Sequence, residues 1–133
     1  MKPKRISRTE EVVRGVLTSC RVATRGIIFA FRSQRNLRIH FFAAAAVLSV
    51  GILLKLTLVE MSVLALTVTL VIAAEMFNTA LEFFLNLMEA RNHPTVRAVK
   101  DVAAGATLIT VIGSIAIGLL LFGPRLLVWA GIY

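Results

Sequence analysis

The feature that most limits the fold of this chain is a set of three apolar runs, at about 39–54, 61–90 and 102–122. The central run begins with fourteen uncharged residues, Met61 to Ala74, and meets its first carboxylate at Glu75. Each run approaches or exceeds the roughly 20 residues that a membrane-spanning helix needs. The hydrophobic fraction of 58% is also too high for an ordinary soluble domain. The chain is therefore predicted to be an all-α integral membrane protein with three transmembrane helices.

The region before these runs divides into a basic tail at 1–8 and a helical pattern from about Thr9 to Phe31. One side of this pattern is apolar. Another side carries four arginines within about 20° of each other, at positions 14, 21, 25 and 32. This pattern fits an amphipathic helix at the membrane interface, because arginines there meet lipid phosphates. A helix packed on the bundle with solvated arginines fits equally well, and both interpretations predict a cytoplasmic surface helix.

The basic residues predict the orientation. Ten of the fifteen lie in the first 38 positions, three at 91–100, one at 55–60 and one at 123–133. Because cytoplasmic flanks of membrane helices are rich in Lys and Arg, the N-terminus is predicted inside and the C-terminus outside. The net charge of +8 is explained by anionic lipid, so no nucleic-acid partner is expected. The single cysteine, Cys20, excludes an intramolecular disulfide.

Proline marks two predicted helix ends. Asn92-His93-Pro94 is expected to stop the second helix, and Gly123-Pro124 to stop the third. The chain is thus predicted to consist of the tail at 1–8, a membrane domain at 9–122 and a C-terminal tail at 123–133, with Trp129 and Tyr133 as interfacial anchors. Small residues recur every four positions in the third helix, a seam for close packing formed by Ala106, Thr110, Ser114 and Gly118.

Polar side chains gather on one side of the second helix. At about 100° per residue, a step of seven from Glu75 to Glu82 returns within roughly 20° of the same direction. Six polar residues share an arc of roughly 100°, namely Glu75, Asn78, Thr79, Glu82, Asn86 and Glu89. Carboxylates beside a membrane span usually face the bundle interior and serve chemistry or transport. This stripe is the predicted site.

Phosphoryl transfer to a lipid hydroxyl suits such a stripe. The deeper Glu75 fits a general base, and Glu82, about 10 Å further out, fits a ligand of Mg²⁺ bound with ATP. No Gly-rich phosphate loop is present, so the nucleotide site would be unrelated to the common ones. Two other interpretations stay open: Asn78 and Thr79 as interhelical hydrogen-bonding residues, and Glu75 as the carboxylate of a small transporter or proton-relay subunit.

Three segments carry a family resemblance: Arg35–His40, the Glu-x-x-Asn-Thr-Ala-x-Glu block of Glu75–Glu82, and Lys100–Ala106. They resemble the prokaryotic diacylglycerol kinase family, which includes undecaprenol kinases, over roughly residues 19–122. The first two segments look closer to the undecaprenol kinase branch. The resemblance implies a homotrimeric lipid kinase of the bacterial cytoplasmic (inner) membrane that uses MgATP to phosphorylate a lipid alcohol.

The resemblance also implies residue roles. Glu75 would be the general base and Glu82 a metal ligand, while Lys100, Asp101 and His93 would contact the nucleotide. Site support would come from the residues Asn78, Thr79, Asn36, Arg38 and Ala104. Without the resemblance, His93 is read as a loop cap and Lys100 as a positive-inside residue.

Two positions depart from the family pattern. Gln34 stands where the family usually has a glutamate that binds the metal, and Asn86 where an aspartate usually follows the second glutamate by four. Both changes remove negative charge, and an amide oxygen binds Mg²⁺ more weakly than a carboxylate does. A family member with reduced activity is therefore a further hypothesis. The apolar surfaces do not identify the lipid.

Overall fold

The computed structural model describes residues 8–87 and 93–132, which form four helices in the order α1 (Arg8–Ser33), α2 (Arg35–Leu53), α3 (Leu58–Leu87) and α4 (Pro94–Trp129). The predicted all-helical architecture is confirmed for these residues. The basic tail at 1–7, the carboxylate of Glu89, Asn92 and Tyr133 lie outside the described residues.

Three of the helices are long and apolar enough to cross a membrane, α2 with 19 residues, α3 with 30 and α4 with 36. At 1.5 Å per residue, α3 and α4 measure about 45 and 54 Å, well beyond a hydrocarbon core of about 30 Å. Their ends therefore have length to extend past the core. This composition is that of a membrane protein, as the sequence predicts.

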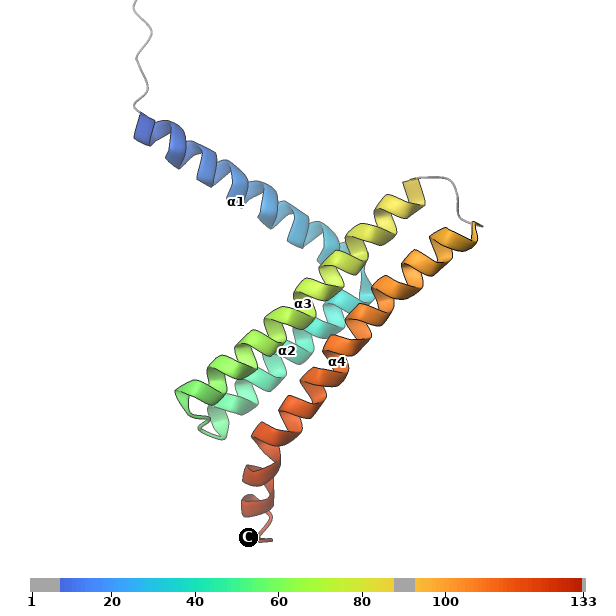
Figure 1. The fold of residues 1–133 in the computed structure, drawn as a ribbon. Helices are drawn as coiled ribbons and strands as arrows, with labels where there is room; N and C mark the ends of the chain where they lie inside the picture. Colours follow the sequence, from blue (N-terminus) through green and yellow to red (C-terminus); the bar gives the residue numbers. More distant parts are fainter. Residues whose placement is uncertain (1–7, 88–92, 133) are drawn as a thin grey trace, which may run out of the picture.

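The three apolar helices run side by side, with α3 packed against both α2 and α4, and α1 projects away from them (Figure 1). Only the C-terminal end of α1 meets the bundle. Phe29 packs against Phe83 at 5.2 Å between ring centroids, and Phe31 against Phe41 at 5.5 Å. The apolar side of the remainder of α1 is exposed.

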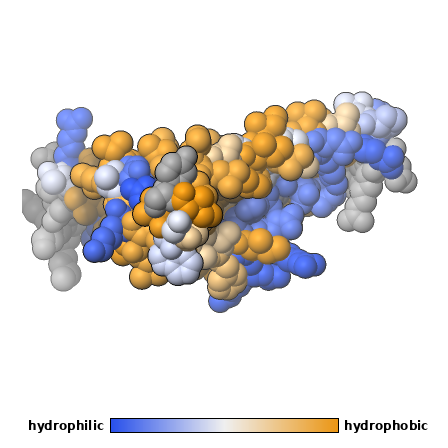
Figure 2. Space-filling view, turned by 90° about the horizontal axis from the view of Figure 1, so that it is seen from below, coloured by the Kyte–Doolittle hydropathy of each residue, from blue (hydrophilic) through white to orange (hydrophobic). Residues whose placement is uncertain are grey.

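The core is thin and consists mainly of Leu37, Ala44, Leu64, Val71 and Leu85. Most other apolar side chains are exposed, and Figure 2 shows them over much of the visible face of the bundle. In lipid this exposure has no hydrophobic cost, since hydrocarbon tails solvate such side chains. The packing between helices therefore depends on close fit at a few positions.

Gly51 is one such position, where α2 meets the start of α3. A Cβ at this residue would lie 2.9 Å from Cδ1 of Leu56 and 3.0 Å from Cε of Met61. A side chain larger than hydrogen would have to displace both neighbours. The glycine therefore permits the tight turn between the two helices.

The start of α3 is fixed by a capping box. The backbone nitrogen of Thr57 donates to Oε2 of Glu60 at 2.7 Å, and the backbone nitrogen of Glu60 donates to Oγ1 of Thr57 at 3.3 Å. Two N–H groups at the helix end are thereby satisfied. The helix begins at Leu58, three residues before the predicted Met61.

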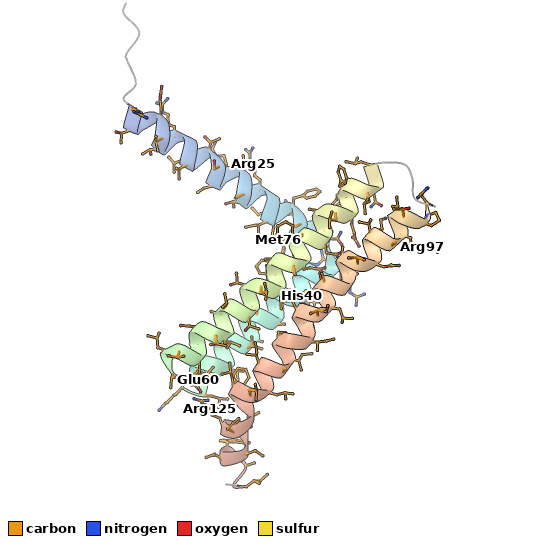
Figure 3. All side chains as sticks on the ribbon, viewed as in Figure 1. Arg25, His40, Glu60, Met76, Arg97 and Arg125 are labelled. Atoms are coloured by element: carbon orange, nitrogen blue, oxygen red, sulfur yellow. The ribbon has the colours of Figure 1, made fainter. Side chains whose placement is uncertain are left out.

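The predicted end of the last helix at Gly123-Pro124 is wrong, because α4 continues through Pro124 to Trp129. Proline removes one backbone donor and weakens the turn before it. The side chain of Arg125 adds a bond to the turn before the proline, since Nη1 donates to the carbonyl oxygen of Leu121 at 3.1 Å. The same guanidinium binds Glu60 with contacts of 2.9 and 2.7 Å, and Figure 3 shows this pair at the end of the bundle opposite Arg97. Trp129 is accordingly the last helical residue and not part of a tail.

We expect Arg125→Ala to lower the thermal midpoint of the detergent-solubilised protein and to increase amide hydrogen exchange at residues 124–129. The variant removes both the bidentate contact to Glu60 and the donor to the carbonyl of Leu121, so the helix after Pro124 should fray. Arg97→Ala, in the first turn of the same helix, is the control. Equal exchange in both variants would show that Arg125 does not hold this segment helical.

Candidate functional site

The polar stripe of α3 faces inward, as predicted. Glu75 and Thr79 are each only 4% exposed, while Asn78 and Glu82 are half-buried. The intervening aromatic and aliphatic side chains Phe77, Leu81 and Phe84 are exposed. Asn86, one turn beyond Glu82, is exposed near the end of the helix. The stripe thus runs from a buried carboxylate outward along a single helix side.

Two oxygens in this stripe have no hydrogen-bond partner in the described part of the chain, Oδ1 of Asn78 and Oγ1 of Thr79. A buried polar atom without a partner costs about 1–3 kcal/mol, so such atoms are rare away from functional sites. Hydroxyls on the same helix usually donate to their own backbone, as Thr67 does to the carbonyl oxygen of Val63 at 2.7 Å. Thr79 makes no such bond among the described residues. Its Oγ1 and the Oδ1 of Asn78 are therefore both available to a bound ligand.

Gln34 reaches the stripe from the junction between α1 and α2. It has an extended backbone (φ −112°, ψ 123°), which interrupts the two helices and turns its side chain toward α3. Its Nε2 donates to Oε2 of Glu82 at 3.3 Å. Two residues that are 48 positions apart in sequence, and that the family resemblance assigns to one metal, therefore touch.

Lys100 ties α4 to the outer end of the stripe. Its Nζ donates to Oδ1 of Asn86 at 2.8 Å. The neighbouring Asp101 is exposed. The structure thereby places Lys100 of α4 beside Asn86, the outermost described residue of the stripe.

Within residues 8–87 and 93–132, the other predicted site residues make no side-chain hydrogen bond to this cluster. Asn36, Arg38 and Ala104 are exposed, and Nη1 of Arg38 donates to the carbonyl oxygen of Arg32 at 3.2 Å. His93 is the N-cap of α4, where Nδ1 accepts from the backbone nitrogen of Thr95 at 3.3 Å. The interpretation of His93 as a cap is therefore confirmed, and its contact with a nucleotide stays a prediction.

One residue of the site was not among the predicted ones. His40 is half-buried on α2 and, together with Glu82, is an electrostatic neighbour of Glu75. It follows the buried Leu37 by three positions and precedes the buried Ala44 by four, which are the spacings of a single helix face. That spacing could have indicated that His40 faces inward, but it does not indicate that His40 lies near Glu75.

No group of three His, Cys, Asp or Glu side chains with metal-binding geometry occurs within residues 8–87 and 93–132. The oxygen donors that do converge are the carboxylate of Glu82 and the amide of Gln34. One carboxylate and one amide suit a hard cation such as Mg²⁺, provided that most of its ligands come from elsewhere. The arrangement fits an ion that arrives with a phosphate ligand better than an ion held by protein alone.

The chain is similar to known proteins over most of its length. The family model described as "Prokaryotic diacylglycerol kinase" matches residues 21–122. A protein of Synechocystis named diacylglycerol kinase is 41% identical over 118 residues, which cover 88% of this chain and 67% of the relative. A protein of Bacillus subtilis named undecaprenol kinase is 39% identical over 104 residues, 78% of this chain and 85% of the relative. The matched range contains every residue of the polar cluster.

We expect Thr79→Val to raise the thermal midpoint, because it replaces a buried hydroxyl that has no partner with a methyl group of similar size. The gain should be of the order of 1 kcal/mol. Thr67→Val is the matched control on α3, where the hydroxyl is already bonded and no gain is expected. A lower midpoint for Thr79→Val than for Thr67→Val would show that the Thr79 hydroxyl is satisfied in the folded protein.

Proposed function

The chain belongs to the prokaryotic diacylglycerol kinase family, and we propose that it transfers the γ-phosphoryl group of ATP to the hydroxyl of a membrane lipid alcohol. The observation that carries the proposal is the buried carboxylate of Glu75 beside two unpartnered oxygens, those of Asn78 and Thr79. A buried carboxylate in an apolar helix requires a functional explanation. A substrate hydroxyl supplies a proton for the carboxylate of Glu75. It also supplies a hydrogen-bond partner for the oxygens of Asn78 and Thr79.

In this reaction Glu75 acts as the general base. The lipid hydroxyl gives its proton to the carboxylate as its oxygen forms a bond to the γ-phosphorus, and the bond from that phosphorus to the bridging oxygen breaks to release ADP. Asn78 and Thr79 orient the hydroxyl. Burial of the carboxylate keeps bulk water away, so that lipid and not water is the acceptor.

Glu82 would hold a Mg²⁺ ion bound with ATP through its carboxylate, and Gln34 would be a weaker second ligand. Such an ion would neutralise the charge on the phosphates. Because Gln34 now turns its amide nitrogen toward Glu82, its side-chain amide must rotate by about 180° to offer oxygen to a cation. Lys100 and Asp101, with His93 at the start of α4, contact the nucleotide, and Asn36, Arg38 and Ala104 line its surroundings.

We further propose the setting of this reaction. The membrane domain runs from α1 through α4, the N-terminus is cytoplasmic and the C-terminus is outside, in the bacterial inner membrane. The basic side of α1 lies on the cytoplasmic surface against anionic lipid. Three copies form the active assembly. The short surface contact of α1 with the bundle supports a helix that is held mainly by lipid.

The family membership argues against a transporter or proton-relay subunit. A family member with reduced activity is the second candidate, favoured by the amides of Gln34 and Asn86 in place of the expected carboxylates. Phosphate transfer from labelled ATP to undecaprenol, diacylglycerol and ceramide in detergent, with and without Mg²⁺, separates the candidates. Transfer to one lipid identifies the substrate, whereas no transfer to any of them contradicts the proposed activity.

Glu75→Gln is expected to reduce turnover by at least about a hundredfold, because an amide cannot accept the hydroxyl proton. Binding of MgATP should change by less than about twofold, since Glu75 lies roughly 10 Å from Glu82 along the helix. Glu11→Gln, on the exposed part of α1, is the control. Turnover of Glu75→Gln within tenfold of the parent would remove Glu75 from the role of base.

Glu82→Gln and Gln34→Glu should change the Mg²⁺ requirement of ATP binding in opposite directions. The first removes the anionic ligand and the second adds one at 3.3 Å from it, so we expect about a tenfold loss and about a tenfold gain in Mg²⁺ affinity. Titration of Mg²⁺ against binding of a fluorescent ATP analogue measures both. If neither change moves the Mg²⁺ midpoint, the two residues do not face the cation.

A further inference from the structure

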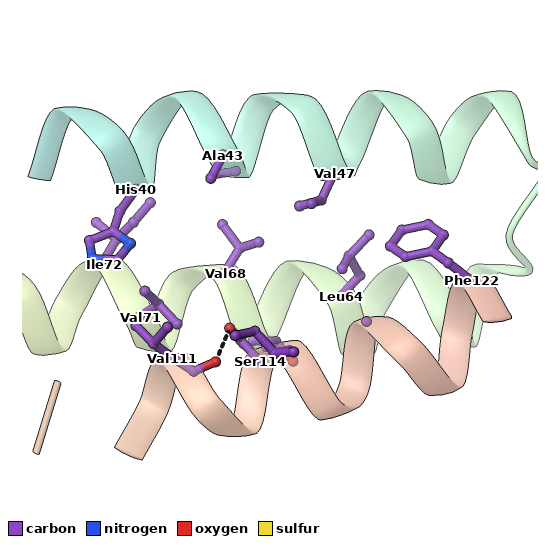
Figure 4. A pocket seen from close by; sticks show the side chains of 14 residues that line it. His40, Ala43, Val47, Leu64, Val68, Val71, Ile72, Val111, Ser114 and Phe122 are labelled. Atoms are coloured by element: carbon purple, nitrogen blue, oxygen red, sulfur yellow. Dashed lines mark hydrogen bonds between the residues drawn. The ribbon is translucent and has the colours of Figure 1, made fainter. Parts of the chain in front are cut away.

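A cavity of about 610 Å³ lies at the end of the bundle opposite the polar stripe, where the end of α2 meets the end of α4. It is lined by Leu53, Leu54, Lys55, Pro124, Arg125, Val128 and Trp129. Figure 1 shows the turn between α2 and α3 and the last turn of α4 at this same end. The cavity shares no residue with the apolar groove of Figure 4, which extends from His40 to Phe122. It is therefore separate from the site of the proposed reaction.

Two cations line this cavity, Lys55 and Arg125, and the described residues of this end supply one carboxylate, that of Glu60. Three of the five N–H groups of Arg125 are occupied, two by Glu60 and one by the carbonyl oxygen of Leu121, so two remain to bind a ligand. Lys55 is exposed, and its Nζ makes no ion pair in the described part of the chain. The cavity therefore has an excess of positive charge that suits an anion.

Lys55 holds its place at a conformational cost. The helix α2 ends in a Schellman motif, in which the backbone nitrogen of Leu56 donates to the carbonyl oxygen of Gly51 at 3.0 Å. The backbone nitrogen of Lys55 donates to the carbonyl oxygen of Ile52, also at 3.0 Å. This motif requires a left-handed backbone at Lys55, with φ 53°, which no other non-glycine residue within 8–87 and 93–132 adopts. A Cβ disfavours that conformation, and glycine is the usual residue there.

The end of α4 provides a comparison within the same molecule. It closes with the same motif, since the backbone nitrogen of Ile132 donates to the carbonyl oxygen of Leu127 at 3.1 Å, and its left-handed residue is Gly131, with φ 72°. The proposed orientation also places this end outside, where cations beside membrane helices are fewer. A lysine at position 55 therefore runs against two preferences, one of the backbone and one of charge. This indicates that its charge has a use.

The rest of the lining is suited to hydrocarbon. Leu53, Val128 and Trp129 are all exposed, and a tryptophan at a helix end is typical of the level of lipid headgroups. An anion that binds here must therefore combine a charged group with apolar chains. Phosphate is the anion that guanidinium and ammonium groups bind best in such a setting. The volume of the cavity lies within the range of ligand sites.

We propose that this cavity binds an anionic phospholipid, with the lipid phosphate between Lys55 and Arg125. The acyl chains lie along the exposed apolar side chains of the lining. Because α2 and α4 both pack on α3 and make few contacts with each other in the described part of the chain, a lipid bound to both joins them at this end. This lipid site goes beyond the proposed kinase activity and does not depend on it.

Lys55 is the better of the two cations to change, because Arg125 also binds Glu60. Lys55→Gly removes the charge and places at this position the residue that the backbone prefers, so the fold should be kept. Lys55→Arg retains the charge at the same backbone position. Arg97→Ala, in the first turn of α4, removes one positive charge at the far end of the helix and is the matched control for net charge.

Trp129 reports on the site directly, because it lines the cavity and is the only tryptophan of the chain. In bilayer nanodiscs, brominated phosphatidylglycerol should quench its fluorescence with an affinity at least about threefold above that of brominated phosphatidylcholine. This ratio should fall to about one in Lys55→Gly and stay at the parent value in Lys55→Arg and Arg97→Ala. No preference in the parent, or an equal preference in Lys55→Gly, would overturn the proposal. Displacement by soluble glycerol 3-phosphate would do the same, because it would identify a water-soluble phosphate as the ligand.

Thermal unfolding gives a second test. In phosphatidylcholine alone, Lys55→Gly should have a midpoint about 2 °C above that of the parent, because glycine adopts the left-handed conformation without strain. Partial replacement by phosphatidylglycerol should raise the midpoint of the parent by about 3 °C and that of Lys55→Gly by less than about 1 °C. A midpoint of Lys55→Gly below the parent in phosphatidylcholine, or a changed oligomeric state on size exclusion, would overturn the proposal in favour of a contact within or between protein chains.

Discussion

The placement of one carboxylate, Glu75, on the inner side of an apolar helix is the constraint on which the rest of the site depends. A charge at this depth is costly, so the residues around it must be polar, close and oriented. His40 on α2 and Asn78 and Thr79 on α3 are the polar residues nearest to it, whereas Lys100 on α4 binds Asn86 at the outer end of the stripe. The thin apolar core mainly keeps these helices in register.

Local periodicity predicted the three apolar helices and the inward stripe of α3, because both are properties of one continuous helix. Contacts between distant positions were not predictable in this way. The helix α4 continues beyond Pro124, where Arg125 binds Glu60 from 65 positions away, and the local proline signal does not reveal this contact. The inward position of His40 could be found from helix spacing, whereas its relation to Glu75 required the packed bundle.

The two amides that depart from the family pattern each have a charged partner. Gln34 donates to Glu82, and Asn86 accepts from Lys100. With carboxylates at both positions, Glu82 would face a like charge that requires a cation for balance. With amides, this repulsion is absent, and each amide bonds the charged side chain beside it. We therefore expect the two amides to stabilise the ion-free cluster.

The two tethers between α3 and α4 lie at opposite ends of the pair, Lys100 to Asn86 at one end and Arg125 to Glu60 at the other. These two contacts join α3 and α4 near both of their ends. The break at Gln34 is by contrast a one-residue hinge between α1 and α2, and its side chain touches Glu82. The residue that separates α1 from α2 is therefore also the residue that contacts Glu82. The Gln34 side chain thus joins the direction of α1 to the polar stripe.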